Sequence, residues 1–166
     1  SSAAVGFGVS LGVVVELDQG RTGVPTPELA VELGKKIDES PGLELRGIMI
    51  MPAPPNIRPF LQEVISEFDK AGLPYPIVSG GSTPCAFTAH EIPELTEFRA
   101  GEYPVGGIKH LSMGTHSVDQ CAGRVFATVV SRPDEDRAVI DAGSKSLSAA
   151  TAITRPAAGC SGAMRN

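Results

Sequence analysis

Several residue types that mark particular protein classes are scarce in this 166-residue chain. It has no tryptophan, and its only three cysteines lie far apart, at Cys85, Cys121 and Cys160. This spacing is unlike the dense cysteine pattern of a disulfide-stabilised secreted domain, so the simplest expectation is a reducing, cytoplasmic compartment. Basic residues are also fewer than acidic ones, with 14 Lys and Arg against 19 Asp and Glu. The resulting net charge of −5 argues against a nucleic-acid partner or an anionic membrane surface.

Long apolar runs are missing as well. The opening stretch SSAAVGFGVSLGVVVEL is apolar, but at about fifteen residues it is too short to cross a bilayer. No Lys or Arg precedes Arg21, so the basic front end of a signal peptide is absent. The missing initiator methionine suggests a chain that begins within a longer protein. With 42% hydrophobic and 20% charged residues, the composition suits a packed core of about one domain.

Strand-like and helix-like patterns alternate through the first hundred residues. Thr26 can cap a helix that starts with Pro27, and apolar residues then recur at helical spacing until Pro41 and Gly42. The expected strands are residues 12–17, 43–51, 75–81 and 95–99, with helices at 26–40 and 57–72 after the first two. Strand–helix repeats of about thirty residues are typical of parallel βαβ units. The first part of the chain is therefore predicted to be an α/β region.

The pattern changes after Tyr103. Residues 123–133 (GRVFATVVSRP) and 136–148 (DRAVIDAGSKSLS) are rich in β-forming residues and are predicted to pair as antiparallel strands. We therefore expect two domains, residues 1–103 and residues 104–166, the second being the start of a β-rich region.

The stretch IVSGGSTP (77–84) ends the third expected strand. In parallel α/β folds, ligands gather at the carboxyl ends of strands. Gly80, Gly81, Ser82 and Thr83 would present bare amides there, with a helix starting at Ser82 or Thr83, and such amides hold phosphate groups. An ordinary tight turn explains the same residues equally well.

Other polar residues follow the remaining strands or lie further along. The first strand is followed by Asp18 and Arg21, although a lone arginine is more often a surface or ion-pairing residue. His110 and His116, with Cys121 nearby, are six residues apart, a spacing that fits no common zinc pattern. No metal ligand is therefore assigned within the chain.

Five runs, taken in order, resemble one enzyme family. They are VVVELDQGRTGV, PGLELRGIM, IVSGGSTP, RAGEY and ATVVSRPDEDRAVIDAGSKSLS. Together they are similar to the D-threonine aldolase and D-serine dehydratase-like family, which are pyridoxal-phosphate enzymes of the alanine racemase fold type. The resemblance implies the C-terminal half of a TIM-like (β/α) barrel followed by the start of a β-rich domain.

The resemblance also implies roles for individual residues. Gly80, Gly81, Ser82 and Thr83 match the loop that holds the cofactor phosphate. Arg21 matches an arginine near the phenolic oxygen of the cofactor ring, and Tyr103 matches a tyrosine at the cofactor end of the last barrel strand. The lysine that forms the Schiff base in the family lies upstream of the residues present here, so no catalytic residue is assigned.

The implied activity is that of a lyase in D-amino acid metabolism. The expected reactions are retro-aldol cleavage of D-threonine-like β-hydroxy amino acids or dehydration of a D-serine-type substrate. The expected cofactors are pyridoxal 5′-phosphate and a divalent metal in the full-length enzyme, and the resemblance implies a homodimer that acts on a small-molecule D-amino acid. Two alternatives stay open: a non-catalytic relative that binds the cofactor or phosphate, and an enzyme with another phosphate ligand on a barrel fold.

The chain departs from the family pattern after the second expected strand. Met51 and Pro54 stand where relatives often carry Tyr and His.

Overall fold

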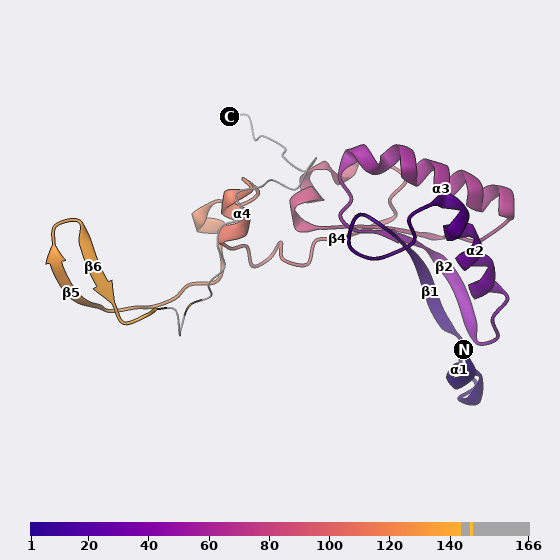
Figure 1. Cartoon of the computed structure of the whole chain (residues 1–166), viewed down its shortest axis with the longest axis horizontal. Helices are drawn as coiled ribbons and strands as arrows, with labels where there is room; N and C mark the ends of the chain where they lie inside the picture. The colour runs from indigo at the N-terminus through magenta and orange to yellow at the C-terminus, as the bar shows by residue number, and fades with distance from the viewer. Residues whose placement is uncertain (144–146, 148–166) are drawn as a thin grey trace. The chain divides into compact units, whose positions relative to one another are not determined.

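Four parallel strands, hydrogen-bonded in chain order, form the sheet of the first part of the chain. The computed structural model describes residues 1–143 and 147. The strands are β1 (Leu11–Leu17), β2 (Leu43–Ile50), β3 (Ile77–Gly81) and β4 (Glu97–Arg99), in the order β1-β2-β3-β4 (Figure 1). The predicted α/β fold with a parallel sheet is therefore confirmed.

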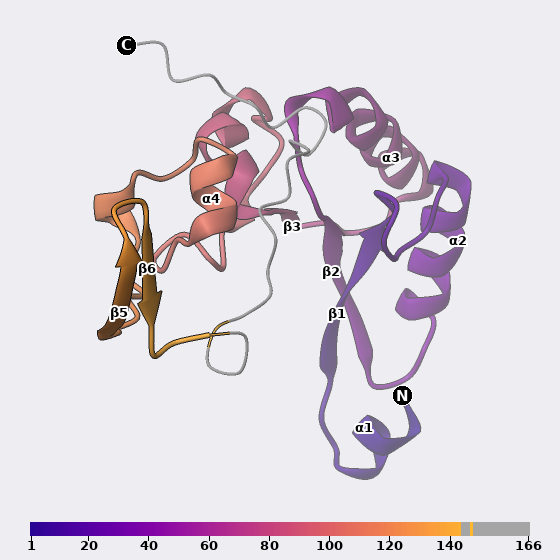
Figure 2. The ribbon, with the colours of Figure 1, turned by 60° about the vertical axis from the view of Figure 1, so that its left-hand side comes forward.

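Two helices connect these strands and lie side by side along the sheet. They are α2 (Pro27–Asp38) and α3 (Arg58–Ala71), and Figure 2 shows them beside β1 and β2. Thr26 caps α2 as predicted, because its hydroxyl accepts a hydrogen bond from the Leu29 amide at 3.4 Å. Helix α3 ends at Gly72, which has the left-handed conformation expected of a C-terminal cap.

The core lies between the sheet and these two helices. The buried side chains of the strands are Val15, Leu17, Leu45, Ile48, Ile50 and Val78, and those of the helices are Ala30, Ile37, Leu61, Val64 and Phe68. They follow the alternation of the strands and the 3.6-residue period of the helices, so burial of apolar surface fixes which face of each element points inward.

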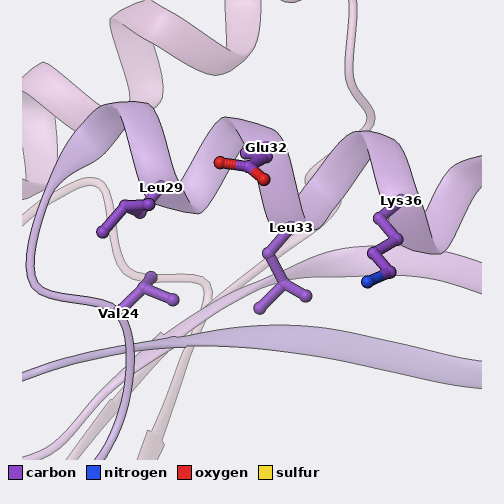
Figure 3. Close-up of a pocket in the computed structure, with 5 residues that line it drawn as sticks. All are labelled: Val24, Leu29, Glu32, Leu33 and Lys36. Atoms are coloured by element: carbon purple, nitrogen blue, oxygen red, sulfur yellow. The ribbon is translucent and has the colours of Figure 1, made fainter.

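One predicted apolar helix face is only partly buried. Ala30 and Ile37 are in the core, but Leu29 and Leu33 are 43% and 36% exposed. These two side chains border a depression of about 220 Å³, which is also lined by Val24, Glu32 and Lys36 (Figure 3). The predicted helical period is confirmed, and the sheet covers only part of the apolar face of α2.

Several short elements complete the first part of the chain. They are α1 (Ser2–Gly6), and the 3₁₀ helices η1 (Pro55–Ile57) and η2 (Thr83–Glu91). The start of η2 agrees with the helix expected at Ser82 or Thr83. The fourth strand is shorter than expected, and residues 2–6 form an exposed helix.

The chain divides into two compact units between Tyr103 and Pro104. The second unit contains α4 (Ile108–Ser112), the 3₁₀ helix η3 (Val118–Gln120), and strands β5 (Val129–Asp134) and β6 (Arg137–Ile140). The last two pair antiparallel, as the sequence predicted, although over shorter spans. In the described part of the chain, none of the helices has the length and apolar character needed to cross a membrane.

Candidate functional site

The carboxyl ends of β1 to β4 meet at one edge of the sheet, because all four strands run parallel. Four loops follow them there, beginning at Asp18, Met51, Ser82 and Ala100. This edge is where open α/β folds place their ligands. It contains all six residues that the sequence analysis selected.

The loop after β1 folds back on its own strand. The Asp18 amide donates to the Val24 carbonyl at 3.0 Å, and the Val24 amide donates to the Glu16 carbonyl at 2.9 Å. Inside this loop, Asp18 Oδ1 accepts hydrogen bonds from the amides of Gly20 and Arg21, at 2.7 and 3.1 Å. The Asp18 carboxylate thus organises the turn that carries the exposed side chain of Arg21.

Two guanidinium groups converge on the thioether of Met51. Arg21 Nη1 lies 3.7 Å from Met51 Sδ, and Arg99 Nη1 lies 3.9 Å from the same sulfur. Neither arginine takes part in an ion pair with any residue of the described chain. A thioether is only a weak acceptor, and the Glu97 carboxylate reaches Arg99 only through the Ser79 hydroxyl, which accepts from Arg99 Nε and donates to Glu97 Oε1. This arrangement can bind an anion.

Arg99, at the end of β4, was not selected from the sequence. Its Nε donates to Ser79 Oγ at 2.8 Å, and its Nη2 lies 3.3 Å from the Ile50 carbonyl and 3.4 Å from the Ser79 carbonyl. One side chain therefore connects the ends of β2, β3 and β4. Its place at the carboxyl end of an expected strand, as the first residue of the run RAGEY, was the available signal.

The structure gives the two glycines of β3 a packing role. A Cβ on Gly80 would lie 2.7 Å from Leu95 Cδ1 and 3.1 Å from Phe98 Cδ2. A Cβ on Gly81 would lie 3.3 Å from the Arg99 guanidinium and 3.3 Å from Met51 Cγ. Side chains of the protein lie next to the positions that these Cβ atoms would take, so the two glycines allow close packing at the end of β3, and the role of their amides in phosphate binding stays a prediction.

The residues that follow the glycines have different environments. The Ser82 amide is already used, since it donates to the Arg99 carbonyl at 3.2 Å. Thr83 is 3% exposed, and its hydroxyl accepts a hydrogen bond from the Glu102 amide at 3.1 Å. Thr83 is also the first residue of η2, so its own amide has no acceptor within that helix. Of the four predicted amides, that of Thr83 is the best placed for an anion.

Tyr103 closes this part of the chain. Its side chain is 49% exposed, and its ring centroid is 6.1 Å from that of Phe87 on η2, with the planes inclined at 57°. The hydrogen bond from Glu102 to Thr83 joins the loop that carries Tyr103 to the start of η2. The structure therefore brings Thr83 and Tyr103 onto connected segments.

The histidines of the second unit lie close to each other. The rings of His110 and His116 are 5.0 Å apart, and the Cys121 thiol is not in a disulfide. Across the residues that the structure describes, there is no group of three or more His, Cys, Asp or Glu residues suited to a metal ion.

Comparison with known proteins places this geometry in a family. Residues 1–108 match the family model described as the alanine racemase N-terminal domain. The chain belongs to this family. Residues 122–164 match a second model, described as a putative serine dehydratase domain. The resemblance stated from the sequence is thus confirmed.

Individual relatives agree with the family assignment. Over 79 residues the chain is 39% identical to D-threo-3-hydroxyaspartate dehydratase from Delftia sp. (strain HT23), a stretch that covers 47% of this chain and 21% of the relative. The solved structure of that enzyme matches with a TM-score of 0.74 and 27% identity, over 89% of this chain and 44% of the relative. The chain spans less than half of that solved relative.

A second solved structure has the same fold. D-threonine aldolase from Filomicrobium marinum matches with a TM-score of 0.65 and 23% identity, over 89% of this chain and 44% of the aldolase. A solved structure named as a dehydratase and one named as an aldolase thus share this arrangement of strands and helices.

Proposed function

We propose that the protein is a pyridoxal-phosphate-dependent lyase that acts on D-amino acids, and that this chain supplies the phosphate cradle and part of the ring pocket. The observation that supports it best is the pair of guanidinium groups without a direct ion pair in the described chain, Arg21 and Arg99, at the carboxyl edge of a parallel sheet. The names of the relatives, a dehydratase and an aldolase, suggest the reaction class.

The proposal includes the architecture expected from the sequence. Residues 1–103 would be the C-terminal half of a TIM-like barrel, and residues 104–166 the start of a β-rich domain. The two family matches, at 1–108 and 122–164, support a boundary in this region.

The residues at the sheet edge fit an anionic, aromatic cofactor. A phosphate ester needs unpaired donors and positive charge, which the Thr83 amide at the start of η2 and the exposed Arg21 offer. Gly80, Gly81 and Ser82 would contribute by shaping the strand end beneath the phosphate. Arg21, held by Asp18, would lie near the phenolic oxygen, and the exposed ring of Tyr103 would line the cofactor end.

The chain's own residues would bind and orient the substrate-cofactor pair. When bound, pyridoxal phosphate supplies an electron sink for the charge left by bond cleavage at Cα or Cβ. Thr83 would fix the phosphate end, while Arg21 would stabilise negative charge near the ring.

Cofactor binding and product analysis test this function. The cofactor-free protein is titrated with pyridoxal phosphate, and the loaded protein is given D-threo-3-hydroxyaspartate, D-serine or D-threonine with and without a divalent metal. Dehydration would release ammonia and a keto acid, whereas retro-aldol cleavage would release glycine and an aldehyde. Cofactor binding without either product would favour the non-catalytic alternative. Failure to bind the cofactor would refute the proposal.

A further inference from the structure

Arg99 makes an unusual set of contacts for a half-buried charged residue. Its guanidinium group contacts the Ser79 hydroxyl, two backbone carbonyls and the Met51 sulfur, all of which are neutral. It forms no ion pair with a residue of the described chain. Withdrawing a cation from water is costly unless hydrogen bonds replace its hydration. The guanidinium nitrogens of Arg99 make such hydrogen bonds, and the same contacts link the ends of β2, β3 and β4.

The backbone of Arg99 holds the other side of the same turn. Its carbonyl accepts the Ser82 amide at 3.2 Å, and Ser82 has a φ of 94°, the only positive value among the described residues other than glycine. Such a conformation is costly for a residue with a Cβ and persists only where its surroundings fix it. Ser82 directly precedes Thr83, the first residue of η2.

We propose that Arg99 is a positioning residue for the phosphate-binding turn. Its side chain locks the ends of β2 and β3, and its carbonyl fixes Ser82, so that the Thr83 amide is held in place before the phosphate arrives. This inference rests on the proposed function. It assigns to Arg99 a role that depends on the shape of the guanidinium fork and not on its charge alone.

A buried hydroxyl completes the link. Ser79 is 1% exposed, and its hydroxyl donates to Glu97 Oε1 at 2.6 Å while it accepts from Arg99 Nε at 2.8 Å. The Ser79 hydroxyl therefore ties Arg99 to β3 from within the sheet. Removing it takes away one acceptor of the fork without changing any charge, which provides a second variant for the test.

The test compares two ligands that differ only in the phosphate. Cofactor-free protein is titrated with pyridoxal phosphate and with pyridoxal, for wild type, Arg99→Lys, Arg99→Gln and Ser79→Ala. Both Arg99 variants are expected to weaken pyridoxal phosphate about tenfold, the size of one lost charge-assisted hydrogen bond, and to leave pyridoxal unchanged. Ser79→Ala is expected to weaken it less. Arg46→Gln, which removes an exposed arginine of β2 paired with Glu44, is the matched control and should bind like wild type.

Each outcome has a defined meaning. Binding by Arg99→Lys at wild-type strength would overturn the inference, because charge alone would then suffice. Equal losses for pyridoxal and pyridoxal phosphate would also overturn it, since the defect would lie in the whole pocket. If Arg99→Gln does not fold, Ser79→Ala and Arg99→Lys decide between these outcomes. If wild type itself does not bind pyridoxal phosphate, the proposed function fails, and the inference about Arg99 fails with it.

Discussion

Replacing Gly80 by alanine tests whether the glycine pair of β3 serves packing or ligand binding. The added Cβ would lie 2.7 Å from Leu95 Cδ1, a separation that real Cβ atoms essentially never show, and 3.1 Å from Leu95 Cδ2 and Phe98 Cδ2. Leu95 and Phe98 both pack against the core. Because close-packed side chains cannot yield freely, we expect Gly80→Ala to lower the free energy of unfolding by about 1–3 kcal/mol.

A double-mutant cycle identifies the cause. Leu95→Ala removes the two methyl groups that the new Cβ would meet, so the cost of Gly80→Ala should fall below about 1 kcal/mol in that background. Urea unfolding of the four proteins, followed by circular dichroism, measures both values. Gly101→Ala is the control, because Gly101 has open space around its Cβ position and should change stability by no more than about 0.5 kcal/mol.

The opposite outcome would refute the packing argument. If Gly80→Ala is as stable as wild type but binds pyridoxal phosphate more weakly, the missing Cβ of Gly80 makes room for the cofactor and not for Leu95 and Phe98. An equal cost of Gly80→Ala with and without Leu95 would also contradict it, because the strain would then arise elsewhere.

Three further predictions concern stability. Gly47→Ala should prevent folding, measured as loss of soluble protein, because its Cβ would overlap the Ile77 carbonyl oxygen in the neighbouring strand. Thr26→Ala should lower the free energy of unfolding by about 1 kcal/mol in urea titrations, because α2 loses its cap. Burial opposes ionisation of Glu94, but backbone and side-chain hydrogen bonds, including one from Arg58, outweigh it and lower its pKa below the ordinary 4.5. A lowered pKa adds stability above pH 4.5 that is lost as pH falls through the folded value, so the stability difference between wild type and Glu94→Gln should shrink on acidification, and a constant difference would contradict this.

Much of the first unit could be predicted from local sequence. The alternation of β-branched runs with helical periods gave the parallel α/β order, and Thr26 and Gly72 marked helix ends, because these signals depend on residues within a turn or two of each other. The exposure of Leu29 and Leu33 could not be predicted from such local signals. How wide a face of α2 is covered depends on which elements pack beside it.

For the candidate site, too, local features were predictable from the sequence and contacts between distant residues were not. The sequence by itself predicted the parallel fold and a glycine-rich stretch at the end of the third strand, because strand and helix periods are local. Five runs in order carried the resemblance to the family. Only the tertiary structure decided that Gly80 and Gly81 make room for protein side chains, and that Arg99 reaches Met51 across 48 residues of sequence. Contacts of that separation depend on how strands stack side by side, which no local period of the sequence encodes.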